Sequence, residues 1–341
     1  MLNTVYRLTA PKQIEAVSFD EKIDEKSIIV RPTYLSICHA DQRYYTGARD
    51  AAVLRKKLPM ALIHEGVGEV VSDKTGTFEI GTRVAIVPNT PIESDEVIAE
   101  NYLRSSKFRS SGFDGFMQEY VITTSSRLVK ILDDVPSNVA AYTEMISVAM
   151  HAIQKLTKVM NSDHESIGIW GDGNLGYISA NMVKSLFPES KIYVFGKNLD
   201  KLNFFSFVDE AYIIDDIPEG LEISHAIEAV GGNGSQYALE QIVDMIKPMG
   251  TVALMGVSEN PIELNTRLSL EKGLTFSASS RSSAENFSDT IQFLADYPQA
   301  RKRYENLVGV QRTIKSIKDI NEFFEEDLTN AWGKSVMKWE I

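Results

Sequence analysis

A glycine-rich turn set between apolar runs constrains this 341-residue chain more than any other stretch. Residues 167–170 form a strand-like apolar run, and residues 171–176 follow directly with the spacing Gly-x-Gly-x-x-Gly. An apolar helical run over 177–186 comes next and leads to a second strand-like run over 191–195. In this order of strand, turn, helix and strand, the glycine spacing predicts a dinucleotide site. The alternative is a glycine-rich turn in an α/β protein of another kind.

Each part of the turn has an expected task at such a site. The first glycine allows the tight turn, the second lets the backbone approach a pyrophosphate, and the third lets helix and strand pack closely. The helix N-terminus adds free N–H groups and a partial positive charge for the phosphates. The predicted cofactor-binding residues of the turn are Gly171, Gly173, Asn174, Leu175 and Gly176.

Composition narrows the class of protein. No run reaches the ~18 uninterrupted apolar residues of a membrane span, and the first residues do not resemble a signal peptide. Cys38 is the single cysteine, so we expect no intrachain disulfide and a reducing, cytoplasmic location. The net charge of −12 argues against general nucleic-acid binding. It leaves an anionic small substrate open, because a local Arg/Lys cluster can override the global field.

The pattern of secondary structure changes near residue 140. Before it, short runs rich in β-branched residues and punctuated by glycine and proline predict a β-barrel or sandwich. These strand-like runs are 28–37, 66–71, 82–88, 117–122 and 128–131. The polar segment 93–112 lacks periodicity, and we expect it to be a long excursion near a site or an interface.

After an expected helix at 142–155, strands and helices alternate. This order, which includes a helix expected over 235–247, predicts a six-stranded, parallel, doubly wound sheet and hence an α/β fold. The strand-like ending at 334–339 is expected to return to the first domain. The predicted domains are residues 1–147 with 281–341 for the β-rich part, and residues 148–280 for the dinucleotide-binding part.

Three short motifs supply the side-chain types of a zinc site. Cys38 follows a strand, His64 and Glu65 open another strand, and Glu144 lies where the two domains are expected to join. Thiolate, imidazole and carboxylate suit a tetrahedral Zn²⁺ with one open position, which polarises a carbonyl oxygen. Taken singly, each residue also has an ordinary interpretation as a small buried hydrophobe or a solvated charge. Spacing alone does not bring them together in space.

In their order relative to the glycine turn, these motifs resemble the zinc-dependent medium-chain dehydrogenase/reductases. The resemblance covers essentially the whole chain and implies a GroES-like β-rich catalytic domain with a Rossmann domain. The stretch around Glu144 is most similar to the polyol dehydrogenases. More narrowly, the chain resembles the ribulose-5-phosphate reductases (ribitol-5-phosphate dehydrogenases) of bacterial teichoic-acid and capsule synthesis. The stretches that carry this narrower resemblance are 44–47, 63–68, 170–176 and 279–282.

The resemblance implies one catalytic zinc, in which two carboxylates compete for the third ligand position. The implied ligands are Cys38, His64, Glu65 and Glu144. A four-cysteine structural zinc loop, found in many relatives, is not expected with a single cysteine. Ala40 stands where many alcohol dehydrogenases carry the Ser or Thr of a proton relay, so the proton donor stays open. The candidates for it are zinc-bound water with Glu65, Tyr44 and His39.

The cofactor prediction rests on the end of the second strand of the dinucleotide unit. In NAD-specific sites an acidic residue there holds the ribose 2′-OH, but residues 194–198 contain no carboxylate. Gly196 makes room and Lys197 supplies positive charge, which favours a 2′-phosphate and hence NADPH. Asp200, the nearest carboxylate in the sequence, keeps NAD as the alternative. Candidates for the nicotinamide half, at the ends of later strands, are Val230, Gly231, Val257 and Ser258.

The resemblance implies that NADPH reduces the C2 ketone of ribulose 5-phosphate to ribitol 5-phosphate, feeding CDP-ribitol and teichoic-acid or capsule synthesis. Its phosphate needs fixed cations. The candidates are Arg43, Arg49 and Arg109, whereas Arg281 is a candidate for the cofactor. The alternatives are a zinc dehydrogenase of a non-phosphorylated polyol such as sorbitol or xylitol and, less favoured, an inactive reductase-fold protein. The resemblance also implies a homodimer and a cytidylyltransferase partner.

Overall fold

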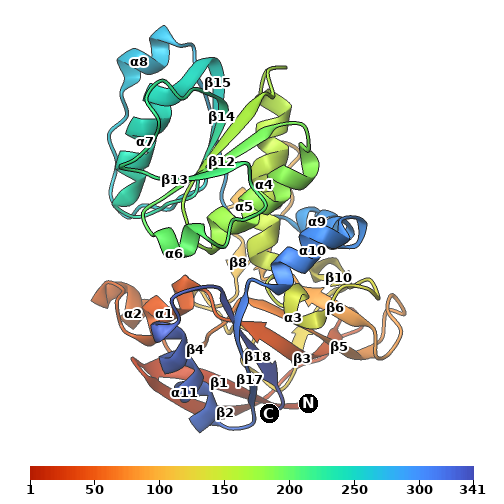
Figure 1. Ribbon diagram of the computed structural model, residues 1–341. Helices are drawn as coiled ribbons and strands as arrows, with labels where there is room; N and C mark the ends of the chain where they lie inside the picture. Colours follow the sequence, from red (N-terminus) through yellow and green to blue (C-terminus); the bar gives the residue numbers. More distant parts are fainter. The chain divides into compact units, whose positions relative to one another are not determined.

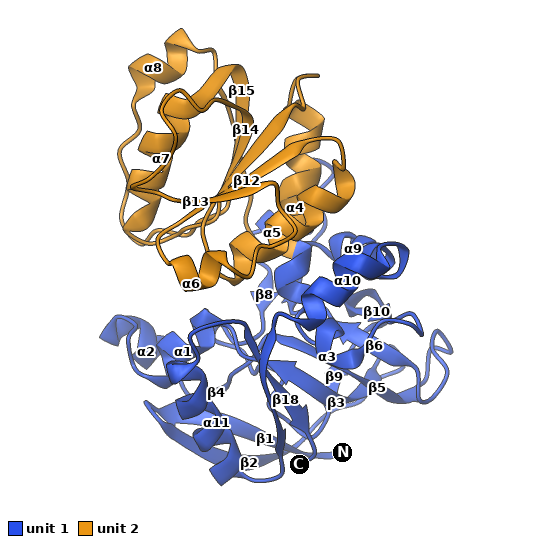
Figure 2. Ribbon diagram, in the orientation of Figure 1, with its two compact units in different colours: residues 1–147, 282–341 blue, residues 148–281 orange.

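The computed structural model describes residues 1–341, and the chain forms two compact units (Figures 1 and 2). Unit 1 comprises residues 1–147 and 282–341, and unit 2 comprises residues 148–281. The helix α4 (Thr143–Val159) carries the chain from the first unit into the second. No helix is long and apolar enough to cross a membrane.

Unit 1 is built on a seven-stranded sheet whose main path is β10-β6-β5-β3-β18-β17, with β9 pairing to β3. A three-stranded sheet, β2-β1-β4, and the short pair β7-β8 complete its strands. The strand β18, from the end of the chain, lies antiparallel to β3 and parallel to β17. Buried side chains from the seven-stranded and the three-stranded sheet form one apolar core. The main sheet therefore ties the C-terminal segment to β3, in the N-terminal part of the chain.

The strands of unit 1 are β1 (Leu2–Ala10), β2 (Gln13–Asp20), β3 (Ile28–Ser36), β4 (Met60–Ala61), β5 (Glu65–Asp73), β6 (Arg83–Ile86), β7 (Asn89–Thr90), β8 (Lys107–Phe108), β9 (Val121–Thr123), β10 (Leu128–Lys130), β17 (Val308–Ile314) and β18 (Lys334–Trp339). Its helices are α1 (His39–Tyr45), α2 (Ala51–Lys57), α3 (Ser137–Ala140), α9 (Ala284–Asp296), α10 (Pro298–Glu305) and α11 (Ile317–Thr329), with 3₁₀ turns η1 (Glu100–Tyr102) and η2 (Ser125–Arg127).

Unit 2 is a six-stranded sheet in the order β13-β12-β11-β14-β15-β16, and every pairing is parallel. Its strands are β11 (Ser166–Trp170), β12 (Lys191–Gly196), β13 (Glu210–Ile213), β14 (Ile223–Glu228), β15 (Ile246–Leu254) and β16 (Thr275–Ala278). Its helices are α5 (Asn174–Leu186), α6 (Leu199–Leu202), α7 (Gly234–Met245) and α8 (Thr266–Glu271). The strand order reverses at β11, as in doubly wound dinucleotide-binding folds. The predicted α/β fold class is confirmed.

Two predicted elements differ from the structure. The helix expected over 235–247 ends at Met245, and Lys247 already belongs to β15. Pro248 explains this end, because the residue before a proline is disfavoured in helical conformation. The strand expected over 117–122 is regular only from Val121. Before it, Gln118 forms a single bridge to β1, and its side-chain amide donates to the Gly115 carbonyl.

Candidate metal centre and dinucleotide site

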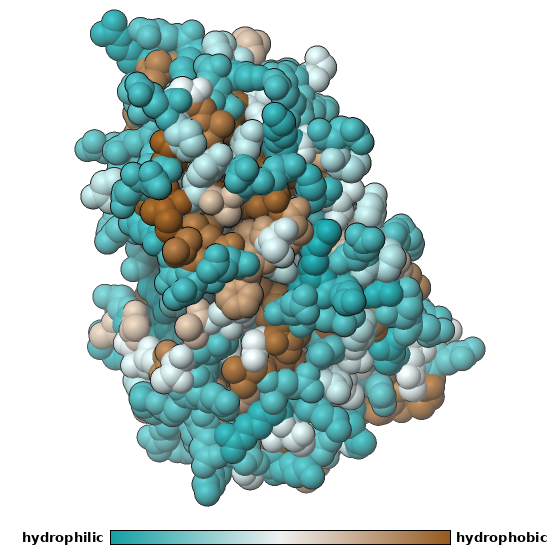
Figure 3. All heavy atoms as spheres, in the orientation of Figure 1, coloured by the Kyte–Doolittle hydropathy of each residue, from teal (hydrophilic) through white to brown (hydrophobic).

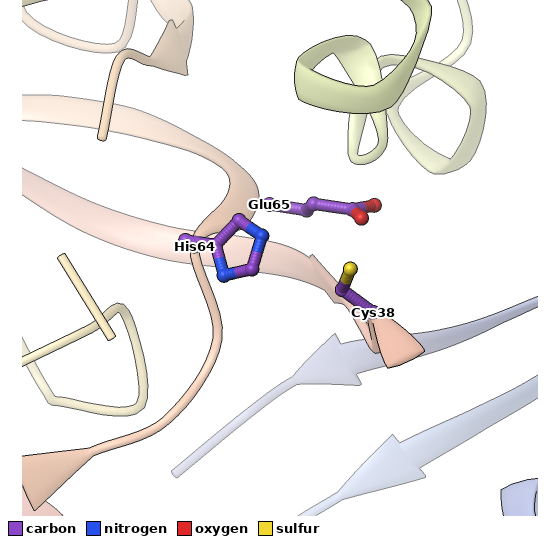
Figure 4. Close-up of side chains that lie close together, drawn as sticks. All are labelled: Cys38, His64 and Glu65. Carbon is purple, nitrogen blue, oxygen red and sulfur yellow. The ribbon is translucent and has the colours of Figure 1, made fainter. Parts of the chain in front are cut away.

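The structure brings Cys38, His64 and Glu65 together in unit 1 (Figure 4). Cys38 caps α1 just after β3, and Glu65 is the first residue of β5. These two strands pair antiparallel, with Ser36 opposite Glu65, so their sheet register places the two motifs side by side. One ligand atom from each of the three residues lies within 4.8 Å of the others. The thiol and the carboxylate face the same space beside the imidazole.

Asp41, which is fully buried, holds both ends of this cluster in place. Its Oδ2 accepts from the Cys38 N–H (3.1 Å), and its Oδ1 accepts from the Ile63 N–H (2.9 Å) and the Ser110 hydroxyl (2.7 Å). Oδ1 also lies 3.8 Å from His64 Nδ1. Ile63 has a φ of 71°, a left-handed conformation that a β-branched residue adopts only when its surroundings enforce it. Asp41 was not predicted as a site residue, although it lies only three residues after Cys38.

A second buried charged residue, Lys334, contacts Glu65 of this cluster. Lys334, from β18, donates to Glu65 Oε1 (2.9 Å) and to the Ile37 carbonyl (2.8 Å), and its Nζ lies 2.8 Å from Glu65 Oε2. Burial by itself would lower the pKa of Lys334, but Glu65 and Cys38 outweigh it and raise that pKa. The pair therefore keeps a lysine charged inside the protein, next to the proposed ligands. No motif in the sequence pointed to Lys334.

Glu144 approaches the cluster from the first turn of α4. Its Oε2 lies 4.0 Å from His64 Nε2, and both side chains are about nine-tenths buried. Burial is the main cause that raises the pKa of Glu144 to about 7, with His64 opposing it. The segment 93–112 also reaches this site, since Phe108 packs against the His64 ring with centroids 5.4 Å apart. Its Ser110 hydroxyl is one of the donors to Asp41.

The donor set fits a zinc ion. Burial raises the pKa of the Cys38 thiol, and His64 lowers it again by hydrogen bonding. Burial opposes protonation of His64, but Asp41, Cys38 and Glu144 together raise its pKa well above the ordinary value. Sulfur, nitrogen and oxygen donors packed this closely, with the Asp41 carboxylate 3.8 Å from the imidazole Nδ1, match the ligands that Zn²⁺ accepts.

A group of cations surrounds Tyr44 in the same unit. The guanidinium of Arg49 lies 4.7 Å from the centre of the Tyr44 ring, and Lys57 Nζ lies 6.0 Å from it. Burial, and then the proximity of Arg49, lowers the pKa of Arg43. Arg49 Nε is buried without a hydrogen-bond partner. Two neighbouring guanidinium groups with an unused donor form a place where an anion is favoured.

The other residues expected to serve catalysis or the phosphate lie in different surroundings. Arg109 donates to the backbone carbonyls of Asp114 (3.2 Å) and Ile122 (2.9 Å), which gives its side chain a structural task. Burial lowers the pKa of Arg109 to about 10. Tyr44 is almost fully buried in the core of unit 1, whereas His39 is exposed.

The glycine turn of unit 2 has the backbone geometry that the sequence predicts. Gly171 has a φ of 130°, which L-residues rarely adopt. A Cβ on Gly176 would lie 1.9 Å from the Gly171 carbonyl oxygen, so α5 can start this close to β11 only with glycine. A Cβ on Gly173 would meet nothing within 4 Å, so the space beside it is open. Asn174 and Leu175 open α5, whose N-terminus adjoins that space.

The carboxyl end of β12 differs from the expectation. Although residues 194–198 contain no carboxylate, the side chain of Asp172 reaches this position from the glycine turn. Its Oδ2 accepts from the backbone N–H groups of Lys197 (2.7 Å) and Asn198 (2.8 Å). We expected no carboxylate at this strand end. None follows β12 in the sequence, but the fold brings the Asp172 carboxylate there. Asp200, the nearest carboxylate in the sequence, lies in the first turn of α6.

Glu228 organises the two loops expected to meet the nicotinamide half. Buried at the end of β14, its carboxylate accepts from the N–H groups of Val230 (2.9 Å), Gly231 (3.2 Å) and Gly256 (3.0 Å), and from the Ser235 hydroxyl (2.9 Å). One signal in the sequence was not used, a carboxylate in the mostly apolar run 225–230.

The remaining candidates for the cofactor lie on loops of unit 2. The Val257 carbonyl accepts from the Gly232 N–H (2.8 Å), and the Ser258 hydroxyl donates to the Asn260 carbonyl (2.8 Å). Arg281 is exposed after β16, with a φ of 59°. The structure therefore brings the loops of Val230 and Val257 together and leaves Arg281 at the end of the unit.

Known proteins show the same arrangement over the full chain. Residues 24–133 match the family model of the alcohol dehydrogenase GroES-like domain. The chain is 54% identical to ribulose-5-phosphate reductase 1 of Staphylococcus aureus, with 99% of each chain covered. It is 52% identical to the ribulose-5-phosphate reductase of Bacillus spizizenii over the whole length of both. A crystal structure of S. aureus TarJ in complex with NADPH has 48% identity, full coverage of both chains and a TM-score of 0.89.

Proposed function

The chain belongs to the ribulose-5-phosphate reductase family, and on this premise we propose that it reduces D-ribulose 5-phosphate to D-ribitol 5-phosphate with NADPH and one zinc ion. The observation that carries the proposal is the meeting of Cys38, His64 and Glu65 in a chain that also holds a dinucleotide turn. Full-length identity to reductases of this name, and a similar structure that contains NADPH, support the same activity. We therefore assign catalysis to unit 1 and cofactor binding to unit 2.

Each group has a task in this reaction. Cys38 and His64 would hold the zinc, with Glu65 or Glu144 as the third ligand. When bound, zinc polarises the ketone oxygen and favours the alkoxide, and NADPH supplies the hydride to C2. Asp41 would orient the imidazole from 3.8 Å away, and Lys334 holds the Glu65 carboxylate in place through a buried ion pair. His64, Glu65 and Glu144 are buried, and charges act more strongly in such surroundings than in water.

Arg43 and Arg49 are the proposed holders of the substrate phosphate. Their closeness and the unused Nε donor of Arg49 support this role, and a guanidinium matches a phosphate bidentately. Arg109 is less suited to bind the substrate phosphate, because its guanidinium already donates to backbone carbonyls. Recognition of the phosphate separates this function from the second candidate, the reduction of a non-phosphorylated ketose or polyol partner on the same metal motif.

Kinetics of an Arg49→Ala variant test the proposal. We expect the KM for D-ribulose 5-phosphate to rise about 10- to 100-fold, because the phosphate loses a charged hydrogen-bonding partner. The kcat and the affinity for NADPH should change little. Arg55→Ala, an exposed arginine in the last turn of α2, is the matched control. Equal activity of the wild-type protein on D-ribulose and on D-ribulose 5-phosphate would defeat the phosphate assignment.

The biological setting belongs to the same proposal. The product would feed CDP-ribitol and teichoic-acid or capsule synthesis in the cytoplasm, where a cytidylyltransferase consumes it. We also propose a homodimer through the outer strand region 274–280. Sedimentation of the pure protein, alone and mixed with the cytidylyltransferase of its source, tests both assemblies.

A further inference from the structure

The carboxyl end of β12 holds a feature that the proposed function does not explain. In doubly wound folds this strand end meets the adenosine ribose, and an acid placed there accepts the 2′-OH of NAD. Here the strand ends at Gly196, yet a carboxylate is present, because Asp172 extends from the glycine turn over that residue. A Cβ on Gly196 would lie 2.6 Å from Asp172 Cβ and 2.8 Å from its Oδ2. Asp172 therefore fills the place that an acid at position 196 would take.

The two oxygens of Asp172 have different surroundings. Oδ2 accepts from both backbone N–H groups of the loop after β12, those of Lys197 and Asn198. Oδ1 accepts no hydrogen bond from the protein, and Asp172 is only half-buried. One oxygen thus fixes the loop that carries Lys197, and the other is left for a donor from outside the chain. A ribose hydroxyl is such a donor.

Asp172 lines a pocket of unit 2 at this strand end. Brown spheres on this face of unit 2 show that hydrophobic residues gather at the surface there (Figure 3). The pocket is lined by Gly171, Asp172, Gly196, Lys197, Val230 and Tyr237, among others. Tyr237 is 61% exposed and lies beneath Lys197, whose Nζ is 5.7 Å from the ring centre. An aromatic face, a lysine and a free carboxylate oxygen together suit an adenosine ribose.

We propose that Asp172 is the ribose-binding acid of this enzyme and sets its preference between NADPH and NADH. Its Oδ1 accepts a hydroxyl of the adenosine ribose, while its negative charge opposes the 2′-phosphate that Lys197 attracts. Asp172 and Lys197 thus act in opposite directions on one group of the cofactor, and the site retains measurable affinity for NADH. This inference rests on the proposed function, since it assumes that unit 2 binds a nicotinamide cofactor.

Removal of the charge at Asp172 gives the direct test. Asp172→Asn keeps an oxygen that accepts from the loop but loses the charge that repels a phosphate and the strong acceptor for a hydroxyl. Both losses change the preference in the same direction. We expect the ratio of the NADH to the NADPH dissociation constant, from fluorescence or calorimetric titration, to rise at least about fivefold. The matched control is Asp200→Asn, an exposed acid in the first turn of α6, which should leave the ratio unchanged.

A double variant keeps the test decisive if the loop loses its shape in the single one. Asp172→Gly with Gly196→Asp moves the acid to the strand end and removes the clash with Asp172. The end of the Leu202 side chain, 2.9 Å from the new Cβ, has to shift. It should bring the ratio of dissociation constants back to within twofold of wild type or shift it towards NADH. The inference is overturned if Asp172→Asn folds and leaves the ratio within twofold, or if the double variant prefers NADPH more than wild type does.

Failure of the inference and failure of the proposed function give different results. If the wild-type protein binds neither NADPH nor NADH, the cofactor assignment fails and takes the inference with it. If it binds NADPH, and Lys197→Met weakens NADPH but not NADH, the cofactor assignment stands. An unchanged ratio in Asp172→Asn then removes only the role given to Asp172.

Discussion

Lys334 and Glu65 carry opposite charges at positions where the side chains are 1% and 0% exposed. Removing one member of such a pair leaves an uncompensated buried charge, which costs about 3–5 kcal/mol. We therefore expect Lys334→Met to lower the free energy of unfolding of the metal-free protein by about that amount, measured by urea denaturation. Lys334→Met with Glu65→Leu should recover most of the loss, because no charge is then left unpaired.

Lys338 provides the control on the same strand. It is about half exposed and pairs with Glu340 at the surface, so Lys338→Met should leave the urea midpoint within measurement error. Equal loss in Lys334→Met and in the double variant would contradict the ion-pair account, because it would assign the whole effect to lost packing.

Asp41 is the residue whose removal separates orientation from ligation. It contacts both proposed ligands but is not one of them, through bonds to the backbone of Cys38 and a 3.8 Å approach to His64. Loss of a carboxylate that orients a ligating histidine costs about 10- to 100-fold in metal affinity. Asp41→Asn should weaken zinc by that factor in competition with a chromophoric chelator. The control is Asp50→Asn, the exposed N-cap of α2, and equal zinc affinity in wild type and Asp41→Asn would refute this role.

At the residue scale, motifs in the sequence identified candidate side chains. They did not show which of these side chains contact one another in the folded chain. Cys38, His64 and Glu65 stand in recognisable spacings, and the pairing of β3 with β5 brings them together. Lys334 is 269 residues away from Glu65 and belongs to no motif. Asp172 illustrates the same limit. Its carboxylate binds the backbone at the end of β12, which is distant from Asp172 in the sequence. Long-range contacts of single charged residues have no local pattern.

At the element scale, the glycine turn between β11 and α5 permits a matched pair of substitutions. Gly173 has a φ of −93° and open space, so alanine fits its backbone. Gly173→Ala should keep full stability but bind NADPH at least about tenfold more weakly, because the methyl group occupies the approach of the pyrophosphate. Gly176→Ala should unfold more easily by at least about 2 kcal/mol, because its methyl group meets the Gly171 carbonyl. Thermal unfolding and NADPH titration check both.

The pair contains its own control, since the two methyl groups are three residues apart on one turn. Weakened NADPH binding in neither variant would show that this turn does not hold the cofactor. Lost stability in Gly173→Ala would show that the space beside it is not available.

Elements were predictable where apolar residues form a continuous buried run. The strands β11 and β12 are mostly buried and were predicted from the sequence. The strand β17 was missed because exposed and partly exposed positions alternate along it without a strong apolar signal. The polar helix α10 was missed for a similar reason. The helix α7 ends before the predicted residue 247, because Pro248 disfavours a helical conformation of the residue that precedes it.

At the scale of the whole molecule, the two chemical tasks belong to different units. The proposed metal ligands all lie in residues 1–147, and the dinucleotide turn and its loops lie in residues 148–281. The change in pattern near residue 140 made the α/β class predictable, because parallel sheets with alternating helices have a distinct sequence signature. The connection of the last strand, β18, into the sheet of unit 1 depends on pairing between distant segments and has a weaker signature.

This separation predicts how the protein responds to loss of metal. A chelator should lower the reduction of D-ribulose 5-phosphate by NADPH at least about 100-fold, because polarisation of the ketone oxygen is lost. The dissociation constant for NADPH should change by less than about twofold, because the ligands of the cofactor are independent of those of the metal. Zinc returned in stoichiometric amount should restore activity, and magnesium, which prefers oxygen ligands, should not. Full activity after zinc has been removed to below a tenth of the protein concentration would exclude the metal from the reaction. NADPH affinity that falls together with the zinc content would show that the two units do not bind their ligands independently.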